Sequence, residues 1–124
     1  VLPSNLTEII DIYKEIPANI DLMSIDTDSY DAEIWLNLRG YRPNLVCIEC
    51  NDEDRSLTED FYELGNPHNS ASVVYLNKVA EEKGYEFVCA TACNAIYLEK
   101  DFAKCPTCGQ LINLTQNFFE RLRR

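Results

Sequence analysis

Apolar residues recur along the chain with two different spacings, which mark helices and strands. Spacings of three and four, as in Leu6, Ile9 and Tyr13, predict an amphipathic helix that ends at Pro17. Short runs of neighbouring apolar residues, such as residues 20–25, predict buried strands. By these two rules the sequence predicts helices over residues 5–16, 29–39, 71–83 and 111–124, and strands over residues 20–25, 44–49, 85–91 and 95–98.

The order of these predicted elements indicates the fold class. A strand, a helix of about ten residues and a second apolar strand predict a parallel β-α-β unit. The last two strands are joined by the short link 92–94 and therefore predict an antiparallel hairpin. We expect a three-layer α/β domain with a mixed sheet that ends in this hairpin.

Composition and charge exclude several classes of protein. The 124 residues match the size of a single domain, and the net charge of −10 disfavours binding to nucleic acids and to anionic membrane surfaces. No apolar run approaches the roughly 18 residues of a membrane span, and no signal peptide is visible, so we expect a cytoplasmic protein. The chain begins with Val1, which indicates a processed, excised or partial chain.

Polar side chains follow both strands of the predicted β-α-β unit. Asp26 and Asp28 come after the first strand, and Glu49 and Asn51 stand at the end of the second. Ligands of parallel sheets bind beyond the carboxyl ends of the strands, and neighbouring strands lie about 4.8 Å apart, so these four side chains should converge. Their oxygen atoms suit Mg²⁺, Mn²⁺ or Ca²⁺, or a carboxylate that accepts a hydroxyl proton. The alternative is that Asp28 only caps the next helix and Glu49 is a solvated strand end.

Cysteine spacing predicts a zinc site near the end of the chain. Cys105 and Cys108 stand in a C-P-x-C-G turn, which is typical of zinc ribbons and supplies two of the four ligands of tetrahedral zinc. Cys89 and Cys93 form the pair that we expect to complete the site.

The remaining cysteines and two other interpretations complete this picture. Cys47 and Cys50 are the poorest zinc ligands, because a separation of three along a strand points them to opposite faces. The pair Cys105 and Cys108 is also compatible with a redox C-x-x-C motif or a structural disulfide. The redox motif usually follows an early strand, and a disulfide requires an oxidising compartment, of which the sequence gives no sign.

Two segments resemble a known family. They read IDLMSIDTDSYDAEIWLNLRGYRPNLVCIECN and ASVVYLNKVAEEKGYEFVCATACNAIYLEKD. They are similar to the C-terminal half of FkbM-type and related S-adenosylmethionine-dependent methyltransferase-like proteins, in which motifs of the form I-D-x-D-[GS]-x-D, V-x-I-E-x-N and C-N-A-[FIY] occur in this order. The resemblance implies strands four to seven of a Rossmann-like sheet over residues 1–101. The pattern of residues 102–124 predicts a cysteine-containing extension and a terminal helix beyond it.

The resemblance also implies a reaction and roles for individual residues. It implies methyl transfer from S-adenosylmethionine to a hydroxyl group, with Asp26 and Asp28 in the catalytic loop. Glu49 and Asn51 would contact the substrate at the places where related metal-dependent enzymes carry Mg²⁺ ligands. Tyr30 would lie at the edge of the substrate cleft.

One part of the family pattern is missing from this sequence. The four glycines stand far apart, so no glycine-rich loop can hold the methyl donor, and we expect that this chain alone does not bind S-adenosylmethionine. A half-sheet would expose the edge of its first strand, which favours an oligomer or pairing with a missing N-terminal half or another protein chain. The alternative function is therefore a non-catalytic, zinc-stabilised interaction or assembly module. The sequence that precedes Val1 in the reading frame would discriminate between the two functions.

Overall fold

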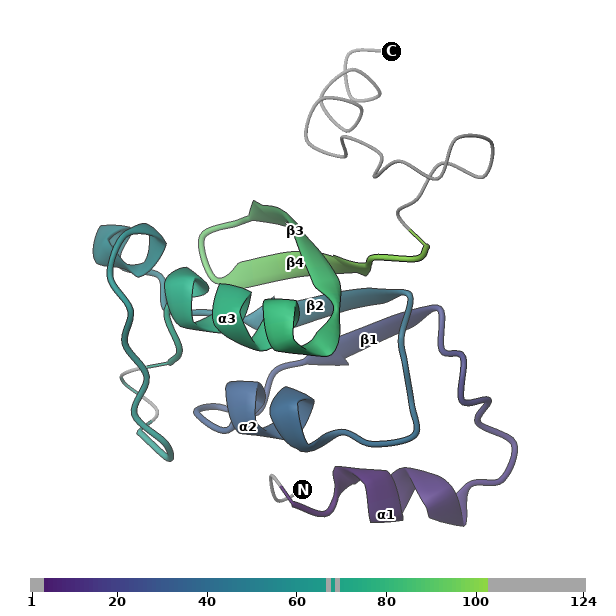
Figure 1. Cartoon of the computed structure of the whole chain (residues 1–124). Coiled ribbons are helices and arrows are strands. Elements are labelled where there is room, and N and C mark those ends of the chain that lie inside the picture. Colours follow the sequence, from purple (N-terminus) through teal and green to yellow (C-terminus); the bar gives the residue numbers. More distant parts are fainter. Residues whose placement is uncertain (1–3, 67, 69, 103–124) are drawn as a thin grey trace, which may run out of the picture.

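A computed structural model describes residues 4–66, 68 and 70–102. It confirms a mixed α/β fold, with the elements arranged as in Figure 1. In chain order they are α1 (Leu6–Ile12), β1 (Leu22–Ile25), α2 (Asp31–Asn37), β2 (Leu45–Glu49), the 3₁₀ helix η1 (Asp54–Leu57), α3 (Val73–Lys83), β3 (Tyr85–Ala90) and β4 (Asn94–Glu99).

The strands form one four-stranded mixed sheet in the order β1-β2-β4-β3. β1 and β2 are parallel, with Ile25 opposite Ile48. β4 is antiparallel to both of its neighbours, with Tyr97 opposite Val46 on β2 and opposite Phe87 on β3. These pairings confirm the predicted parallel unit and the predicted hairpin, and they show that β4 inserts between β2 and β3.

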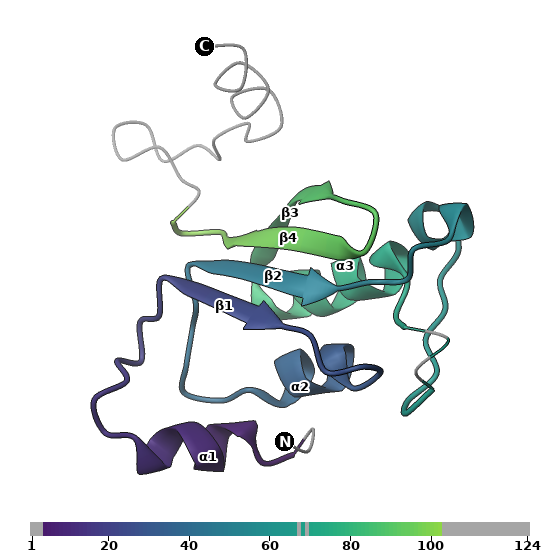
Figure 2. The ribbon, with the colours of Figure 1, turned by 180° about the vertical axis from the view of Figure 1, so that it is seen from behind.

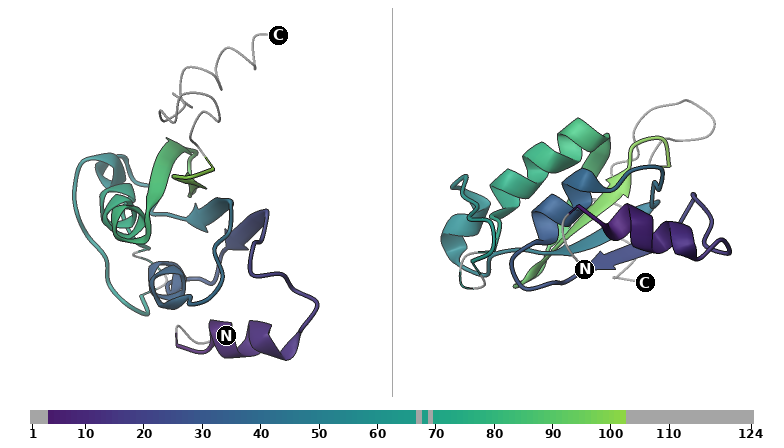
Figure 3. Two further views of the ribbon diagram at one scale, coloured as in Figure 1. Left: turned by 45° about the vertical axis from the view of Figure 1, so that its right-hand side comes forward. Right: turned by 90° about the horizontal axis from the view of Figure 1, so that it is seen from below.

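Helices α2 and α3 pack side by side on one face of the sheet, and α1 packs against α2 (Figure 3). The core lies between this helix pair and the strands. Trp35 of α2 is 0% exposed, and its ring lies 5.3 Å from that of Tyr85 and 5.0 Å from that of Tyr97. The Tyr97 hydroxyl group donates a 2.7 Å hydrogen bond to Oδ1 of Asn77, which satisfies the polar end of this buried ring.

The other face of the sheet carries no helix in the described part of the chain (Figure 2). β1, β2 and β3 follow one another across the sheet in one direction, and right-handed crossovers then place α2 and α3 on the same face. Residues 4–66, 68 and 70–102 therefore form two layers, whereas the sequence predicted three. We call the uncovered side the open face and define it by the strand residues whose side chains point to it, which are Leu22, Ser24, Leu45, Cys47, Glu49, Glu86, Cys89, Asn94, Ile96 and Leu98.

The ends of all three described α-helices differ from the predicted positions, and α2 spans Asp31–Asn37 where residues 29–39 were predicted. α1 ends at Ile12, before Pro17 is reached. α3 begins at Val73, because Ser72 caps it by accepting a hydrogen bond from the backbone N–H of Tyr75. None of the helices described is long and apolar enough to cross a membrane.

Candidate metal centre

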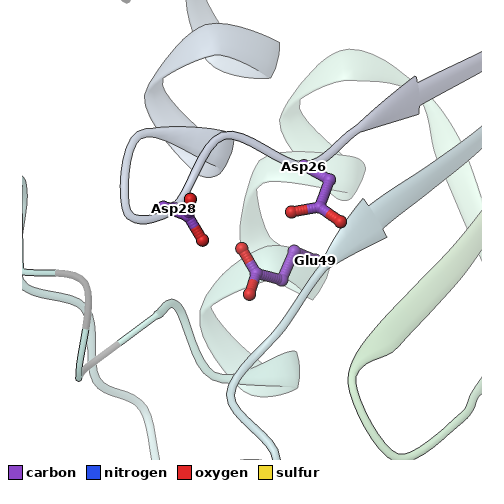
Figure 4. A group of neighbouring side chains, drawn as sticks. All are labelled: Asp26, Asp28 and Glu49. Atoms are coloured by element: carbon purple, nitrogen blue, oxygen red, sulfur yellow. The ribbon is translucent and has the colours of Figure 1, made fainter.

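Three carboxylates meet where the parallel strands β1 and β2 end. Asp26 follows the last residue of β1, and Glu49 is the last residue of β2. Asp28 lies on the turn between β1 and α2, and its carboxylate points back toward Asp26 and Glu49 (Figure 4). One oxygen from each of the three side chains lies within 4.8 Å of the others, and this is the one such group of His, Cys, Asp or Glu side chains in the described residues. The predicted convergence of these three residues is confirmed.

The turn that carries Asp28 has an unusual backbone. Asp28 has a φ of 51° and Ser29 a φ of 107°, both in the left-handed region that favours glycine. Such a conformation costs on the order of 1–3 kcal/mol for a residue with a Cβ, so the surroundings must hold it in place.

A buried carboxylate, Asp31, holds this turn. It is 3% exposed, and its two oxygens accept hydrogen bonds from the backbone N–H groups of Thr27 (2.8 Å) and Ser29 (3.2 Å). Burial raises the pKa of Asp31, and the bonds from these N–H groups lower it. The N-cap of α2 is Tyr30, without a side-chain capping bond, so Asp28 is not the cap of this helix.

A second support comes from the long loop between β2 and α3. The backbone carbonyl of Ser29 accepts a 3.4 Å hydrogen bond from the hydroxyl group of Tyr62 and one of 3.5 Å from the N–H of Gly65. Tyr30 lies over Gly65, where an added Cβ would come within 3.1 Å of the tyrosine hydroxyl oxygen. The loop therefore packs on the back of the acidic turn, and Tyr30 mediates that contact.

The acidity of Glu49 is strongly perturbed. Burial, followed by the negative charges of Asp31, Asp26 and Asp28, raises the pKa of Glu49 to about 7. Its Oε2 atom is buried and has no hydrogen-bond partner among the described residues. A carboxylate in this position gains from any cation that neutralises the cluster, because the charged form is otherwise destabilised by its neighbours.

The donor set and its exposure define the chemistry that this place can support. Three carboxylate oxygens are hard ligands, which suit Mg²⁺ or Mn²⁺ better than softer metals. Asp26 and Asp28 are exposed, so water or a substrate oxygen can complete the coordination.

Asn51, the fourth residue predicted for this site, has another contact. It is 7% exposed, and its Oδ1 accepts a 2.9 Å hydrogen bond from the backbone N–H of Glu53. It lines a hollow of about 160 Å³ between η1 and the β3–β4 turn, together with Cys50 and Ser56. Asn51 therefore supports the loop that leaves β2.

Of the four predicted zinc ligands, the structure describes Cys89 and Cys93, and neither belongs to the group of three carboxylates. Cys89 is on the open face, half-buried, and Cys93 is exposed in the β3–β4 turn. Cys105 and Cys108 lie outside the described residues, so the zinc site stays a prediction. Cys47 is half-buried on the open face and Cys50 is buried, as expected for the opposite faces of one strand.

Asp31 is the functional residue that the sequence reasoning did not single out. The signal was present, since Asp31 is the third aspartate of the segment Ile25-Asp-Thr-Asp-Ser-Tyr-Asp31. An aspartate at the first position of a helix that also follows a strand is well placed to accept bonds from the N–H groups of the preceding turn.

Comparisons of this chain with protein-family models, with curated proteins and with solved structures found no match.

Proposed function

We propose that Asp26, Asp28 and Glu49 bind one hard divalent cation, Mg²⁺ or Mn²⁺, and that this site positions a hydroxyl-bearing acceptor for methyl transfer. The observation that carries the proposal is the convergence of the three carboxylates at the ends of two parallel strands. The resemblance to methyltransferase-like proteins supplies the reaction class, because Asp26 and Asp28 stand in the segment that matches the family's catalytic loop.

In this proposal the three carboxylates have different roles at the site. Glu49, with its raised pKa and unpartnered Oε2, is the ligand that gains most from a cation. Asp26 and Asp28 are exposed, so they can contact both the cation and the acceptor. A cation held here would lower the pKa of a coordinated hydroxyl group, and Asp26 or Asp28 could then take the proton.

The methyl donor does not fit the residues of this chain. Gly40, Gly65 and Gly84 each occupy an isolated turn or helix end, and no two glycines are close enough in sequence for a phosphate or ribose cradle. In this proposal the donor is held by a second unit, which pairs along β1. β1 is an edge strand among the described residues, and it is the strand to which the first strand of the family's sheet would pair.

Titration calorimetry with MnCl₂ and MgCl₂ tests the cation site. We expect Asp28→Asn and Glu49→Gln each to weaken binding by about tenfold or more, since each removes one of three charged ligands. Asp52→Asn is the matched control, because Asp52 is an exposed acid near the same strand end but outside the cluster. Wild-type affinity should be about tenfold lower at pH 6 than at pH 8, because a carboxyl group with a pKa near 7 must lose its proton to bind metal.

Two results would count against the site: equal affinities for wild type and the two variants, or an affinity that does not depend on pH between 6 and 8. Adding S-adenosylmethionine to the metal-loaded chain tests the second part separately. We expect no heat of binding, and micromolar binding would show that the donor cradle is in this chain after all.

The free edge of β1 favours a second function, assembly with another chain. Within the part of the chain that the structure describes, β1 pairs with β2 on one side only, and Leu22 at this edge is 58% exposed. Unpaired strand edges are templates for pairing with another strand, and a charge on the edge opposes it. Light scattering coupled to size exclusion should show an oligomer that Leu22→Lys shifts toward the monomer, and a wild-type monomer at all concentrations would contradict assembly.

A further inference from the structure

We propose that residues 111–124 form an amphipathic helix that docks on the open face of the sheet as its missing third layer. This inference concerns the open face, which meets the metal centre at Glu49, and it does not depend on a bound metal.

The open face is apolar and lacks a cover in the described residues. Leu22 is 58% exposed and Leu45, Cys47 and Ile96 are half-buried, whereas Leu98 on the same face is 7% exposed. On the helix-covered side, in contrast, residues of the same strands such as Val46 and Tyr97 are 0% exposed. A sheet face with this composition is normally buried against another layer, since folds are built by packing apolar faces together.

The pattern of residues 111–124 matches such a face. On a helix of 3.6 residues per turn, its six large apolar residues fall within an arc of about 160°, with Asn113, Gln116 and Glu120 on the opposite side. These six residues are Leu111, Ile112, Leu114, Phe118, Phe119 and Leu122. No other segment of the sequence outside the described residues offers an apolar face of this size.

The dimensions and the point of departure are compatible with docking. β4 ends at Glu99, beside the start of β2, so this end of the sheet is the one opposite the metal centre. Residues 100–102 continue from there. Residues 103–110 can span up to roughly 26 Å when extended, whereas the outer strands of a four-stranded sheet lie only about 14 Å apart. A helix of 14 residues is about 21 Å long, which is about the length of the strands it would cover.

Charge also favours this occupant. The charged strand residues on the open face are Glu49 and Glu86, and no lysine or arginine of the strands accompanies them. Residues 111–124 carry Arg121, Arg123 and Arg124 against the single acid Glu120. Arg121 and Arg123 flank the apolar arc of the predicted helix, so they would lie at its contact with the sheet. A second copy of this acidic chain would instead bring like charges together.

The rate at which N-ethylmaleimide modifies each cysteine of the full chain tests this inference. Cys47 and Cys89 report on the open face, Cys50 reports on the core, and Cys93 in the exposed turn is the reference. Peptide mass spectrometry gives each rate, and every measurement is made both without and with EDTA, which removes zinc. We expect Phe118→Asp to raise the rates at Cys47 and Cys89 about tenfold relative to Cys93, because it places a charge in the docked face.

Asn117→Asp is the matched control. It adds the same charge at the neighbouring position, on the polar side of the predicted helix, and should leave both rates unchanged. If Phe118→Asp also exposes Cys50, the core has opened, and Phe118→Ala then replaces it as the milder variant, with the same expectation for Cys47 and Cys89.

Three outcomes would overturn the inference. Equal rates at Cys47 and Cys89 in the Phe118 and Asn117 variants, with Cys50 still protected, would show that this segment does not cover the face. Protection that rises with protein concentration would assign the face to a second copy. Protection of Cys89 that is lost when EDTA alone is added would assign it to zinc binding.

Discussion

The helix-covered face of the sheet and the acidic turn after β1 are joined by the same strands but are stabilised in opposite ways. The covered face is apolar and closely packed, as the ring contacts of Trp35 with Tyr85 and Tyr97 show, and its one buried side-chain donor without a partner among the described residues is Nε1 of Trp35. The turn combines a left-handed backbone at Ser29 with clustered carboxylates, and Glu49 has an unpartnered oxygen. The difference indicates that the helix-covered face stabilises the fold, whereas the acidic turn destabilises it in order to hold the carboxylates in a binding geometry.

Trp35→Ala should have the largest effect on stability and little effect on the site. It removes a side chain that is 0% exposed, and such truncations cost about 3–5 kcal/mol. Urea unfolding followed by circular dichroism measures the loss, with Leu57→Ala at an exposed position as the control. If the fraction that remains folded lost its affinity for Mn²⁺ as well, the separation of the two regions would be wrong.

Asp31→Ala should lower both the stability of the fold and the affinity for Mn²⁺, because Asp31 links the acidic turn to the start of α2. We expect about 2–3 kcal/mol of destabilisation from the loss of two hydrogen bonds to a charged acceptor, and weaker Mn²⁺ binding because Asp28 is no longer held. Asp31→Asn keeps one acceptor oxygen and should show a smaller loss of both. Unchanged metal affinity in the alanine variant would refute a positioning role for Asp31.

Glu49→Gln should change how stability depends on pH. The folded pKa of Glu49 is raised from 4.5 to about 7, so between these values the folded state binds more protons than the unfolded state. The stability of the metal-free wild type should therefore fall as pH rises from about 4.5 to about 7, by roughly 2 kcal/mol after allowance for partial exposure. Urea titrations at several pH values measure this effect. Without metal, the free energy of unfolding of the variant should not fall between pH 4.5 and pH 7. Saturating Mn²⁺ should restore the stability that the wild type loses over this range. Parallel curves for both proteins would contradict the assigned pKa.

Ser29→Gly should have the smallest effect and the opposite sign. Glycine adopts a φ of 107° without a Cβ penalty, so we expect a gain of about 1 kcal/mol in the free energy of unfolding. Ser24→Gly in β1 is the control and should destabilise, because Ser24 has no positive φ among the described residues. A loss of stability in both variants would show that Ser29 is not strained.

Much of the fold could be predicted from the sequence, because helix and strand periodicity are local properties. The spacing of Leu76, Val79 and Ala80 predicted α3, and the apolar run of β2 predicted its strand. The one-sided placement of the helices could not be obtained in this way, because it depends on the order of strands in the sheet and on the handedness of both crossovers.

The positions of those site residues that stand at the ends of strands could be predicted from the sequence. Asp26 and Glu49 meet because the carboxyl ends of parallel neighbours lie at one edge. Asn51 could not be placed by the same rule, because its side chain bonds to the N–H of Glu53 within its own loop. Asp31 is recognisable only once the turn is seen to wrap around its carboxylate.

The sequence by itself therefore determined the elements, the parallel unit, the hairpin and the acidic character of the strand ends. These depend on residue spacing and on chain connectivity over short distances. Only the tertiary structure decided that β4 inserts between β2 and β3, that Asp28 turns back toward Glu49, and that the pKa of Glu49 rises to about 7. Each of these depends on groups that are distant in sequence and close in space, where burial and Coulomb interactions, rather than periodicity, set the outcome.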